Sequence, residues 1–157
     1  MNLKLCYITK EYFEENKNNV KMLDIGNPNK QAKRSHLCLQ IKTDSNNYYV
    51  PLRNNLGAEI RKYGRIGHSV ANSSRPLTGL DYRYTLIIND QKYIEIPHEQ
   101  RIPNSQIKII KKDYGKIEHE LSVYVNGFIK AYKKNRIEKE PLYRESSLIN
   151  FIDYLNK

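Results

Sequence analysis

The stretch that decides the fold is Leu37-Cys38-Leu39-Gln40-Ile41, then Thr43-Asp44-Ser45-Asn46, then Tyr48-Tyr49-Val50-Pro51-Leu52. Apolar residues alternate on both sides of the polar tetrad, which is typical of a β-hairpin closed by a short loop. Pairing Lys42 with Asn47 places three apolar pairs on one face, as a half-buried sheet requires: Ile41 with Tyr48, Leu39 with Val50, and Leu37 with Leu52.

This register also predicts a polar patch at the end of the hairpin. It sets His36 opposite Arg53 and Arg34 opposite Asn55, all on the face away from the apolar pairs. Two guanidiniums, an imidazole and an amide would then share one surface. Guanidinium groups match phosphate oxygens, so such a patch indicates a polyanionic ligand.

Shorter signals surround the hairpin. Residues 3–8 alternate and predict a strand, Thr9 can cap a helix that runs to Glu15, and residues 26–29 form a turn cluster that ends this unit. Residues 54–78 look irregular apart from a helical turn at 58–62. A second hairpin is expected from residues 83–88 and 92–96 around Asn89-Asp90-Gln91.

The last third has a helical period. Asn104 or Ser105 is expected to cap the first helix, and Gly115 to break or bend it. An amphipathic stripe follows, and a final helix starts near Ser146 and buries Leu148, Phe151, Ile152 and Leu155. The stripe comprises Ile117, Leu121, Tyr124, Val125, Phe128 and Tyr132. The chain is therefore predicted to be a single α+β domain, residues 1–157, with a helical C-terminal third.

Positive charge is concentrated in one third of the chain. The 157 residues carry 27 Lys and Arg against 17 Asp and Glu, a net charge of +10. Between Gly26 and Pro76 nine cations face only Asp44 and Glu59, so this third holds +7 of that charge. A local excess of this kind attracts nucleic acid, although a basic surface that only keeps the protein soluble is the alternative.

Several function classes are excluded by what the sequence lacks. It has no Gly-rich phosphate loop and no dinucleotide fingerprint, its four His never fall at metal-ligand spacing, and its acidic residues are isolated. Two Cys are too few for a disulfide scaffold, no apolar run could span a membrane, and no secretion signal opens the chain. A soluble, cytoplasmic protein without metal or cofactor is expected. Chemistry on RNA would then use attack of the ribose 2′-OH on the adjacent phosphate.

The order of several segments resembles a known family, the type III toxin–antitoxin toxins (ToxN, AbiQ and TenpN-like endoribonucleases), with the TenpN-like branch most similar because of Pro51-Leu52-Arg53. The segments are Tyr7-Ile8, Ala32-Lys33-Arg34 before Leu37–Ile41, Tyr49–Asn55, Gly79-Leu80-Asp81-Tyr82 before Leu86-Ile87-Ile88, and Tyr114 ahead of the long helix.

The resemblance implies a fold, an activity and a partner. The fold would be a strongly bent, barrel-like antiparallel sheet with flanking helices. The activity would be metal-independent, sequence-specific RNA cleavage that leaves a 2′,3′-cyclic phosphate. A repeated, pseudoknotted RNA antitoxin would inhibit the toxin in closed ring-like complexes, and release of the toxin on phage infection would cause abortive infection.

The expected site residues combine the patch with the resemblance. The candidate catalytic residues are Lys33 (base or phosphate ligand), Arg53 (phosphate contact), Asn54 and Tyr114. The candidate RNA-binding residues are Lys30, Arg34, His36, Asn55, Arg61, Lys62, Arg65, Arg75 and Arg83. For His36, the structural or RNA-stacking role is preferred to that of a general base.

Other residues have expected roles of their own. Tyr7, Tyr49 and Tyr82 could stack unpaired bases. Asp81 could orient Arg83 or cap a turn, and Cys6 and Cys38 are expected to be buried neighbours in the sheet.

Asn54 departs from the family pattern, because many relatives have Ser at this step. An amide can donate a hydrogen bond to phosphate but cannot carry a proton at neutral pH. Either the Ser is not the proton carrier, or this chain is weakly active or inactive. Two other functions remain open: a nucleic-acid-binding module that does not cleave, and a toxin that binds a protein target.

Overall fold

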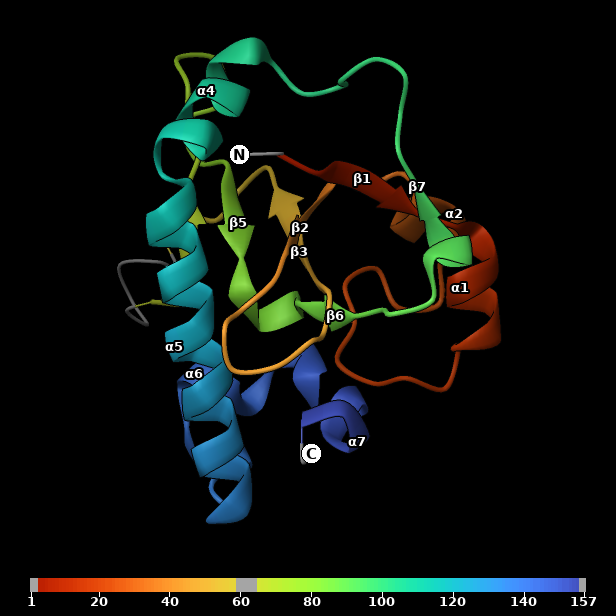
Figure 1. The fold of residues 1–157 in the computed structure, drawn as a ribbon, viewed down its shortest axis with the longest axis vertical. Coiled ribbons are helices and arrows are strands. Elements are labelled where there is room, and N and C mark those ends of the chain that lie inside the picture. Colours follow the sequence, from red (N-terminus) through yellow and green to blue (C-terminus); the bar gives the residue numbers. More distant parts are fainter. Residues whose placement is uncertain (1–2, 59–64, 156–157) are drawn as a thin grey trace.

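The protein is a mixed α+β domain built on an open antiparallel sheet, as a computed structural model that describes residues 3–58 and 65–155 shows (Figure 1). Across the sheet the strands run in the order β4 (Gly67–Ser69), β5 (Gly79–Asp81), β3 (Tyr48–Arg53), β2 (His36–Leu39), β1 (Leu5–Ile8) and β7 (Ile94–Glu95), and β6 (Leu86–Ile87) also pairs with β3. The predicted α+β class is confirmed. The sheet does not close into a barrel, because the path of paired strands ends at β4 on one side and at β7 on the other.

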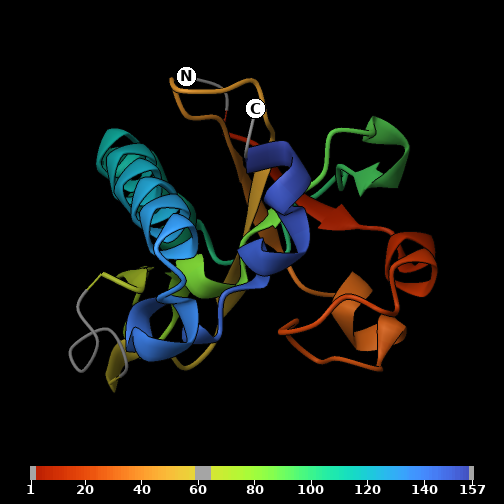
Figure 2. The same ribbon diagram turned by 90° about the horizontal axis from the view of Figure 1, so that it is seen from below.

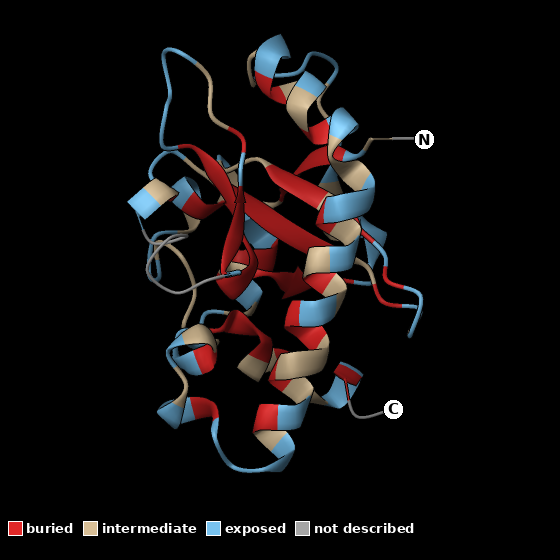
Figure 3. Cartoon of the chain, turned by 90° about the vertical axis from the view of Figure 1, so that its left-hand side faces the viewer, coloured by how far each residue is buried: buried red, intermediate tan, exposed pale blue. Residues whose placement is uncertain are grey.

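Helices flank the sheet on both sides. The long helix α5 lies along one side, and α1 and α2 lie beyond the other (Figure 2). The helical segments are α1 (Lys10–Glu15), α2 (Pro28–Ala32), η1 (Tyr82–Tyr84), η2 (Gln91–Tyr93), α4 (Asn104–Lys112), α5 (Tyr114–Lys133), η3 (Ile137–Lys139), α6 (Pro141–Arg144), η4 (Ser147–Phe151) and α7 (Ile152–Leu155). The strands are largely buried, whereas the helices expose their outer faces (Figure 3).

The N-terminal unit forms largely as its sequence predicts. The Thr9 hydroxyl accepts a hydrogen bond from the Tyr12 backbone N–H at 3.3 Å, so Thr9 caps α1, which buries Tyr12 and Phe13. The turn predicted at residues 26–29 is instead the start of α2. Asn27 accepts from the Lys30 N–H at 3.1 Å, and Pro28 occupies the first helical position, where its missing N–H costs nothing.

The central hairpin forms with a register two residues away from the predicted one. Leu37 pairs with Val50 and Leu39 with Tyr48, whereas His36 lies opposite Pro51. An even shift keeps every side chain on its predicted face, so the apolar face is buried as expected.

The loop of this hairpin, residues 40–47, is longer than predicted because tertiary contacts hold it. Asn46 donates to the carbonyl of Tyr154 at 3.2 Å, and Asn89 Oδ1 accepts from the Asn47 N–H at 2.9 Å. The Tyr48 hydroxyl donates to Asp44 within the same loop at 2.5 Å. These partners lie in distant segments, so the turn signal alone could not set the loop length.

The prediction of a second hairpin is wrong. β6 pairs with β3, with Tyr49 opposite Leu86, and β7 pairs with β1, with Ile8 opposite Ile94. The two apolar runs therefore bind different strands, and η2 separates them. The region expected to be irregular, residues 54–78, contains β4, which pairs with β5 directly after that region. The helical turn predicted at 58–62 lies mostly outside the described residues.

The helical third follows the predicted periodicity. Ile117, Leu121, Tyr124, Val125 and Phe128 are buried on α5, and Tyr132 is half-buried. The chain breaks at Asp113, two residues before the glycine predicted to do so, and α4 starts without a side-chain cap. Ser146 caps the last helical segment, which buries Leu148, Phe151 and Leu155 but leaves Ile152 half-buried.

No helix in the described ranges is long and apolar enough to cross a membrane.

Candidate functional site

A hollow of about 290 Å³ lies where β2 begins and β3 ends, and we call it the basic groove. Its lining contains five cations and no carboxylate among the described residues. It is lined by Tyr7, Lys30, Lys33, Arg34, Ser35, Leu52, Asn54, Arg75, Arg101 and Ile102. An excess of positive charge in a concave site favours a polyanion.

Antiparallel pairing brings Lys33 and Asn54 into this groove. The start of β2 and the end of β3 meet at the same edge of the sheet, where the Leu52 N–H donates to the Ser35 carbonyl at 3.0 Å. Lys33 follows α2 immediately and is exposed, and among the described residues it makes no ion pair. Asn54 follows β3, so ammonium and amide line one groove although 21 positions separate them.

Two other cations of the groove are anchored on Asp24. Arg34 Nη2 lies 2.8 Å from Asp24 Oδ2, and Lys30 Nζ lies 3.2 Å from Asp24 Oδ1. Burial opposes ionisation of Asp24, but the hydrogen bonds from Arg34 and Lys30 outweigh it and lower the pKa of the carboxyl. Arg34 also donates to the Leu52 carbonyl at 3.1 Å, so its guanidinium stabilises the junction of the strands.

Tyr7 and Arg101 form another part of the lining. The Tyr7 ring is only 6% exposed, and its hydroxyl accepts from Ser35 Oγ at 3.1 Å. The Arg101 guanidinium carbon lies 4.7 Å from the centre of that ring, a cation–π contact. Arg101 was not predicted as a site residue because it comes from a segment far along the chain. Its positive charge was the one sequence feature that could have suggested a role in binding.

Arg53 does not line the groove. Successive side chains of a strand point to opposite faces, so Arg53 points away from the face that carries Leu52 and Asn54. Its Nη1 atom lies 2.9 Å from Oδ2 of Asp81, a residue with no exposed surface. Arg83 is buried and binds the same carboxylate through Nε and Nη2 at 3.0 and 2.8 Å. Both guanidiniums also lie over the ring of Tyr84.

The prediction for Asp81 is confirmed in both of its forms. Its carboxylate binds the Arg83 guanidinium, and it also caps η1 by accepting from the Arg83 N–H at 3.0 Å.

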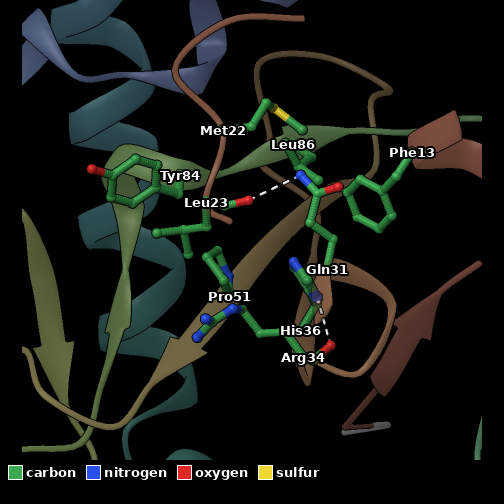
Figure 4. A pocket seen from close by; sticks show the side chains of 9 residues that line it. All are labelled: Phe13, Met22, Leu23, Gln31, Arg34, His36, Pro51, Tyr84 and Leu86. Atoms are coloured by element: carbon green, nitrogen blue, oxygen red, sulfur yellow. Dashed lines mark hydrogen bonds between the residues drawn. The ribbon is translucent and has the colours of Figure 1, made fainter. Parts of the chain in front are cut away.

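His36 is buried in a different small pocket, which Arg34, Pro51 and Tyr84 also line (Figure 4). Its ring is 4% exposed, and Nδ1 lies 3.0 Å from the Arg34 carbonyl oxygen. Burial lowers the pKa of His36 to about 4, against the opposing effect of that hydrogen bond, so the ring is neutral at pH 7. The expectation that His36 contacts RNA is therefore wrong, and the structural role is the one observed.

The predicted patch of Arg34, His36, Arg53 and Asn55 does not form. The register shift sets His36 opposite Pro51, and burial removes its ring from the surface. Asn55 is exposed but is not part of the groove lining. Alternation correctly placed Arg53 on the face away from Leu52, but the groove is lined by Leu52 and Asn54, so the predicted patch is not the groove.

The remaining candidates are distributed over the molecule. Lys30, Lys33, Arg34, Asn54 and Arg75 line the groove as a group. Tyr114 starts α5, packs half-buried against the core and has its pKa raised by burial, and it does not line the groove. Arg65 is exposed outside the groove, and Arg61 and Lys62 lie outside the described residues.

Among the other predicted residues, Tyr7 reaches the groove but Tyr49 and Tyr82 are 1% and 0% exposed, so their predicted stacking on bases is wrong. Cys6 is buried and Cys38 half-buried, and both thiols are free. The described ranges contain no group of three or more His, Cys, Asp or Glu that could hold a metal ion.

Solved structures share this architecture. AbiQ, a lactococcal anti-phage endoribonuclease of the type III toxin–antitoxin system, aligns with a TM-score of 0.61 at 18% identity, over 99% of this chain and 98% of its own. The chain has the AbiQ fold. A second structure, from work on a processed non-coding RNA that regulates a bacterial antiviral system, aligns with a TM-score of 0.65 at 14% identity, over 92% and 96%.

At these identities the likeness to AbiQ is one of fold. No protein-family model matches this chain, and no curated protein matches its sequence significantly. Within the AbiQ-like fold, two of the segments that carried the sequence resemblance, Ala32–Arg34 and Tyr49–Asn55, meet at the basic groove. These two segments are distant in the sequence and lie side by side in this fold.

Proposed function

We propose that this protein is an endoribonuclease toxin of the type III toxin–antitoxin kind, and that RNA lies in the basic groove. The observation that carries the proposal is the convergence of Lys30, Lys33, Arg34, Arg75 and Arg101 on one groove, without a lining carboxylate, in a fold shared with the endoribonuclease AbiQ. Five cations in one groove favour a phosphate backbone.

The groove offers groups suited to transfer of a phosphoryl group from the 5′ oxygen to the 2′ oxygen of RNA. In this mechanism the 2′-OH attacks the adjacent phosphorus and the P–O5′ bond breaks. The 5′ oxygen takes up a proton from water, so that a 2′,3′-cyclic phosphate and a 5′-OH result. Lys33 can take up the 2′ proton or bind a phosphate oxygen, and Asn54 can donate a hydrogen bond to that phosphate. Arg75 and Arg101 would stabilise charge that develops on the phosphate.

Arg53 has a supporting role in this proposal. Its guanidinium binds the buried carboxylate of Asp81, and so it holds the end of β3 from the face opposite Leu52. This replaces the direct phosphate contact expected from the sequence. Arg83 likewise stabilises Asp81 rather than RNA.

The partners follow from the same proposal. AbiQ belongs to a type III toxin–antitoxin system, and the second relative comes from an antiviral system regulated by a processed non-coding RNA. We therefore propose that a repeat RNA antitoxin inhibits this chain in the cytoplasm, in a closed ring-like complex. Abortive infection would be the consequence of releasing the toxin.

The test compares two exposed lysines. Lys33→Ala should abolish growth inhibition and RNA cleavage, whereas Lys42→Ala, which removes an exposed lysine outside the groove, should leave both intact. Circular dichroism would check that both variants fold. A Lys33→Ala protein that remains as toxic as the parent would contradict the assigned site.

Asn54 favours one second candidate function, RNA binding without cleavage. Its amide lies in the groove where a proton carrier would be needed, and an amide cannot transfer a proton at neutral pH. Mapping RNA ends after brief induction of the protein distinguishes the two. New ends with 2′,3′-cyclic phosphate support the endoribonuclease, and salt-dependent binding without new ends supports the binding module.

A further inference from the structure

One part of the groove lining belongs to the segment that leads into α4. Arg101 and Ile102 line the groove, and α4 starts two residues after them at Asn104 (Figure 1). Arg75 lines the groove from the loop that connects β4 and β5. The separation of Arg75 and Arg101 therefore depends on how α4 is held relative to that loop.

The Asn72 side chain joins these two segments directly. Its Oδ1 atom accepts hydrogen bonds from the Arg75 N–H at 2.7 Å and from Ser74 Oγ at 3.1 Å. Its Nδ2 atom donates to Ser105 Oγ, in the first turn of α4, at 3.0 Å. A single amide thus connects the loop that carries Arg75 with the helix that follows Arg101.

His68 fastens the other end of α4. This β4 residue is 8% exposed, and its Nε2 atom lies 3.0 Å from Asp113 Oδ2, at the point where α4 ends. Its Nδ1 atom lies 2.9 Å from Glu120 Oε1, which also accepts from the Tyr82 hydroxyl at 2.8 Å. Each ring nitrogen of His68 thus lies within hydrogen-bond distance of a carboxylate, so the ring connects the edge of the sheet to the end of α4 and to α5.

The packing of α4 is otherwise imperfect. Gln106, on its inner face, has no exposed surface, and neither polar atom of its amide has a hydrogen-bond partner among the described residues. A buried polar group without a partner opposes docking of the helix. The burial of Ile110 and the two polar connections at the ends of α4 together offset this cost.

We propose that His68 and Asn72 are positioning residues that hold α4 in place and so set the separation of Arg75 and Arg101 across the groove. Neither residue lines the groove itself. The consequence of this proposal for catalysis rests on the proposed function, whereas the attachment of α4 by His68 and Asn72 does not. We therefore test the attachment without RNA and the consequence with RNA.

Hydrogen exchange of the RNA-free protein tests the attachment. Ser105→Ala and Asp113→Ala should each accelerate exchange of the amides in 108–112 roughly fivefold, as loss of one hydrogen bond implies, and leave those in 121–128 of α5 unchanged. Ser105→Thr, which retains the hydroxyl, and Glu118→Ala, which removes an α5 carboxylate with no hydrogen bond to His68, should behave like the parent. Unchanged exchange in α4, or equal acceleration in α5, would overturn the proposal.

A double-mutant cycle tests the consequence for RNA. Ser105→Ala should raise KM for RNA roughly threefold and leave kcat unchanged, because it moves Arg101 without removing it. Combined with Arg101→Ala it should add nothing further, and additive effects would contradict the proposed coupling. If the parent neither binds nor cleaves RNA, the proposed function fails, and the exchange result still decides whether His68 and Asn72 hold α4.

Discussion

Arg53 and Asn54 are adjacent in the sequence but contact different parts of the molecule. Arg53 binds the buried carboxylate of Asp81 at 2.9 Å, and Asn54 lines the basic groove. Arg53 is the last residue of β3 and points away from the face of Leu52, whereas Asn54 follows the strand. The two residues therefore differ in what they do, and their substitutions should separate stability from activity.

Arg53→Ala should act on stability. It removes one of the two guanidiniums bound to Asp81, and since the Arg53 side chain is 26% exposed we expect a loss of about 1 to 2 kcal/mol in the free energy of unfolding. Urea denaturation of Arg53→Ala and of Arg65→Ala, which removes an exposed cation outside the groove, measures the difference. Normal stability together with lost cleavage would instead show a direct contact of Arg53 with RNA.

Asn54→Ser should act on chemistry. A hydroxyl in the groove can take part in proton transfer, whereas the amide cannot, so we expect the cleavage rate on single-stranded RNA to rise roughly tenfold or more. Asn55→Ser provides the matched control, because Asn55 is exposed and lies outside the groove lining. Equal rates for Asn54→Ser and the parent would show that position 54 only supports the groove.

The salt dependence of RNA binding should report the groove cations. Each cation that neutralises a phosphate releases counterions, so Arg101→Ala should reduce the slope of log K against log salt concentration by roughly 0.7 for a single strand. Binding titrations at several salt concentrations measure the slope. Lys42→Ala should leave it unchanged, and an equal decrease for both variants would indicate diffuse attraction by the whole surface.

Acid should destabilise the fold through His36. The ordinary pKa of 6.5 applies in the unfolded chain, and burial lowers the pKa to about 4 in the folded protein. Between these values the unfolded state binds more protons, so stability falls as the pH falls from about 6.5 to about 4, by roughly 3 kcal/mol in total.

The control for this prediction is a variant that cannot titrate at position 36. In His36→Asn the side-chain amide can still donate to the Arg34 carbonyl, and carboxylate effects are common to both proteins. The difference in unfolding free energy between parent and variant should therefore shrink or change sign across this pH range. A constant difference would mean that His36 takes up its proton equally in both states.

Local patterns predicted the elements that depend on neighbouring residues. The Thr9 cap set the start of α1, and the apolar stripe from Ile117 to Phe128 set the buried face of α5. Alternation assigned the buried face of β2 and β3 even though the register was two residues off. These features follow from periodicity and from hydrogen bonds that span a few residues, so no distant partner is needed.

Partnership between distant segments could not be predicted in this way. β6 pairs with β3 and β7 with β1 rather than with each other, and the loop of the central hairpin is held by Tyr154 and Asn89. In the site, Arg101 contacts the Tyr7 ring and Arg53 binds Asp81, and no local sequence pattern predicted either contact. Several partners compete for each strand edge and each guanidinium, and packing of the whole chain decides among them.

The sequence by itself determined the α+β class, the helical last third, the concentration of positive charge between Gly26 and Pro76, and the segments that resemble type III toxins. Only the tertiary structure decided which cations converge on one groove, that Asn54 rather than Arg53 joins Lys33 there, and that α4 is fastened by His68 and Asn72. The physical reason is the distance along the chain over which each interaction acts. Periodicity and capping act over one or two turns of chain, whereas a binding site is made of side chains whose proximity exists only after the sheet has paired and the helices have packed against it.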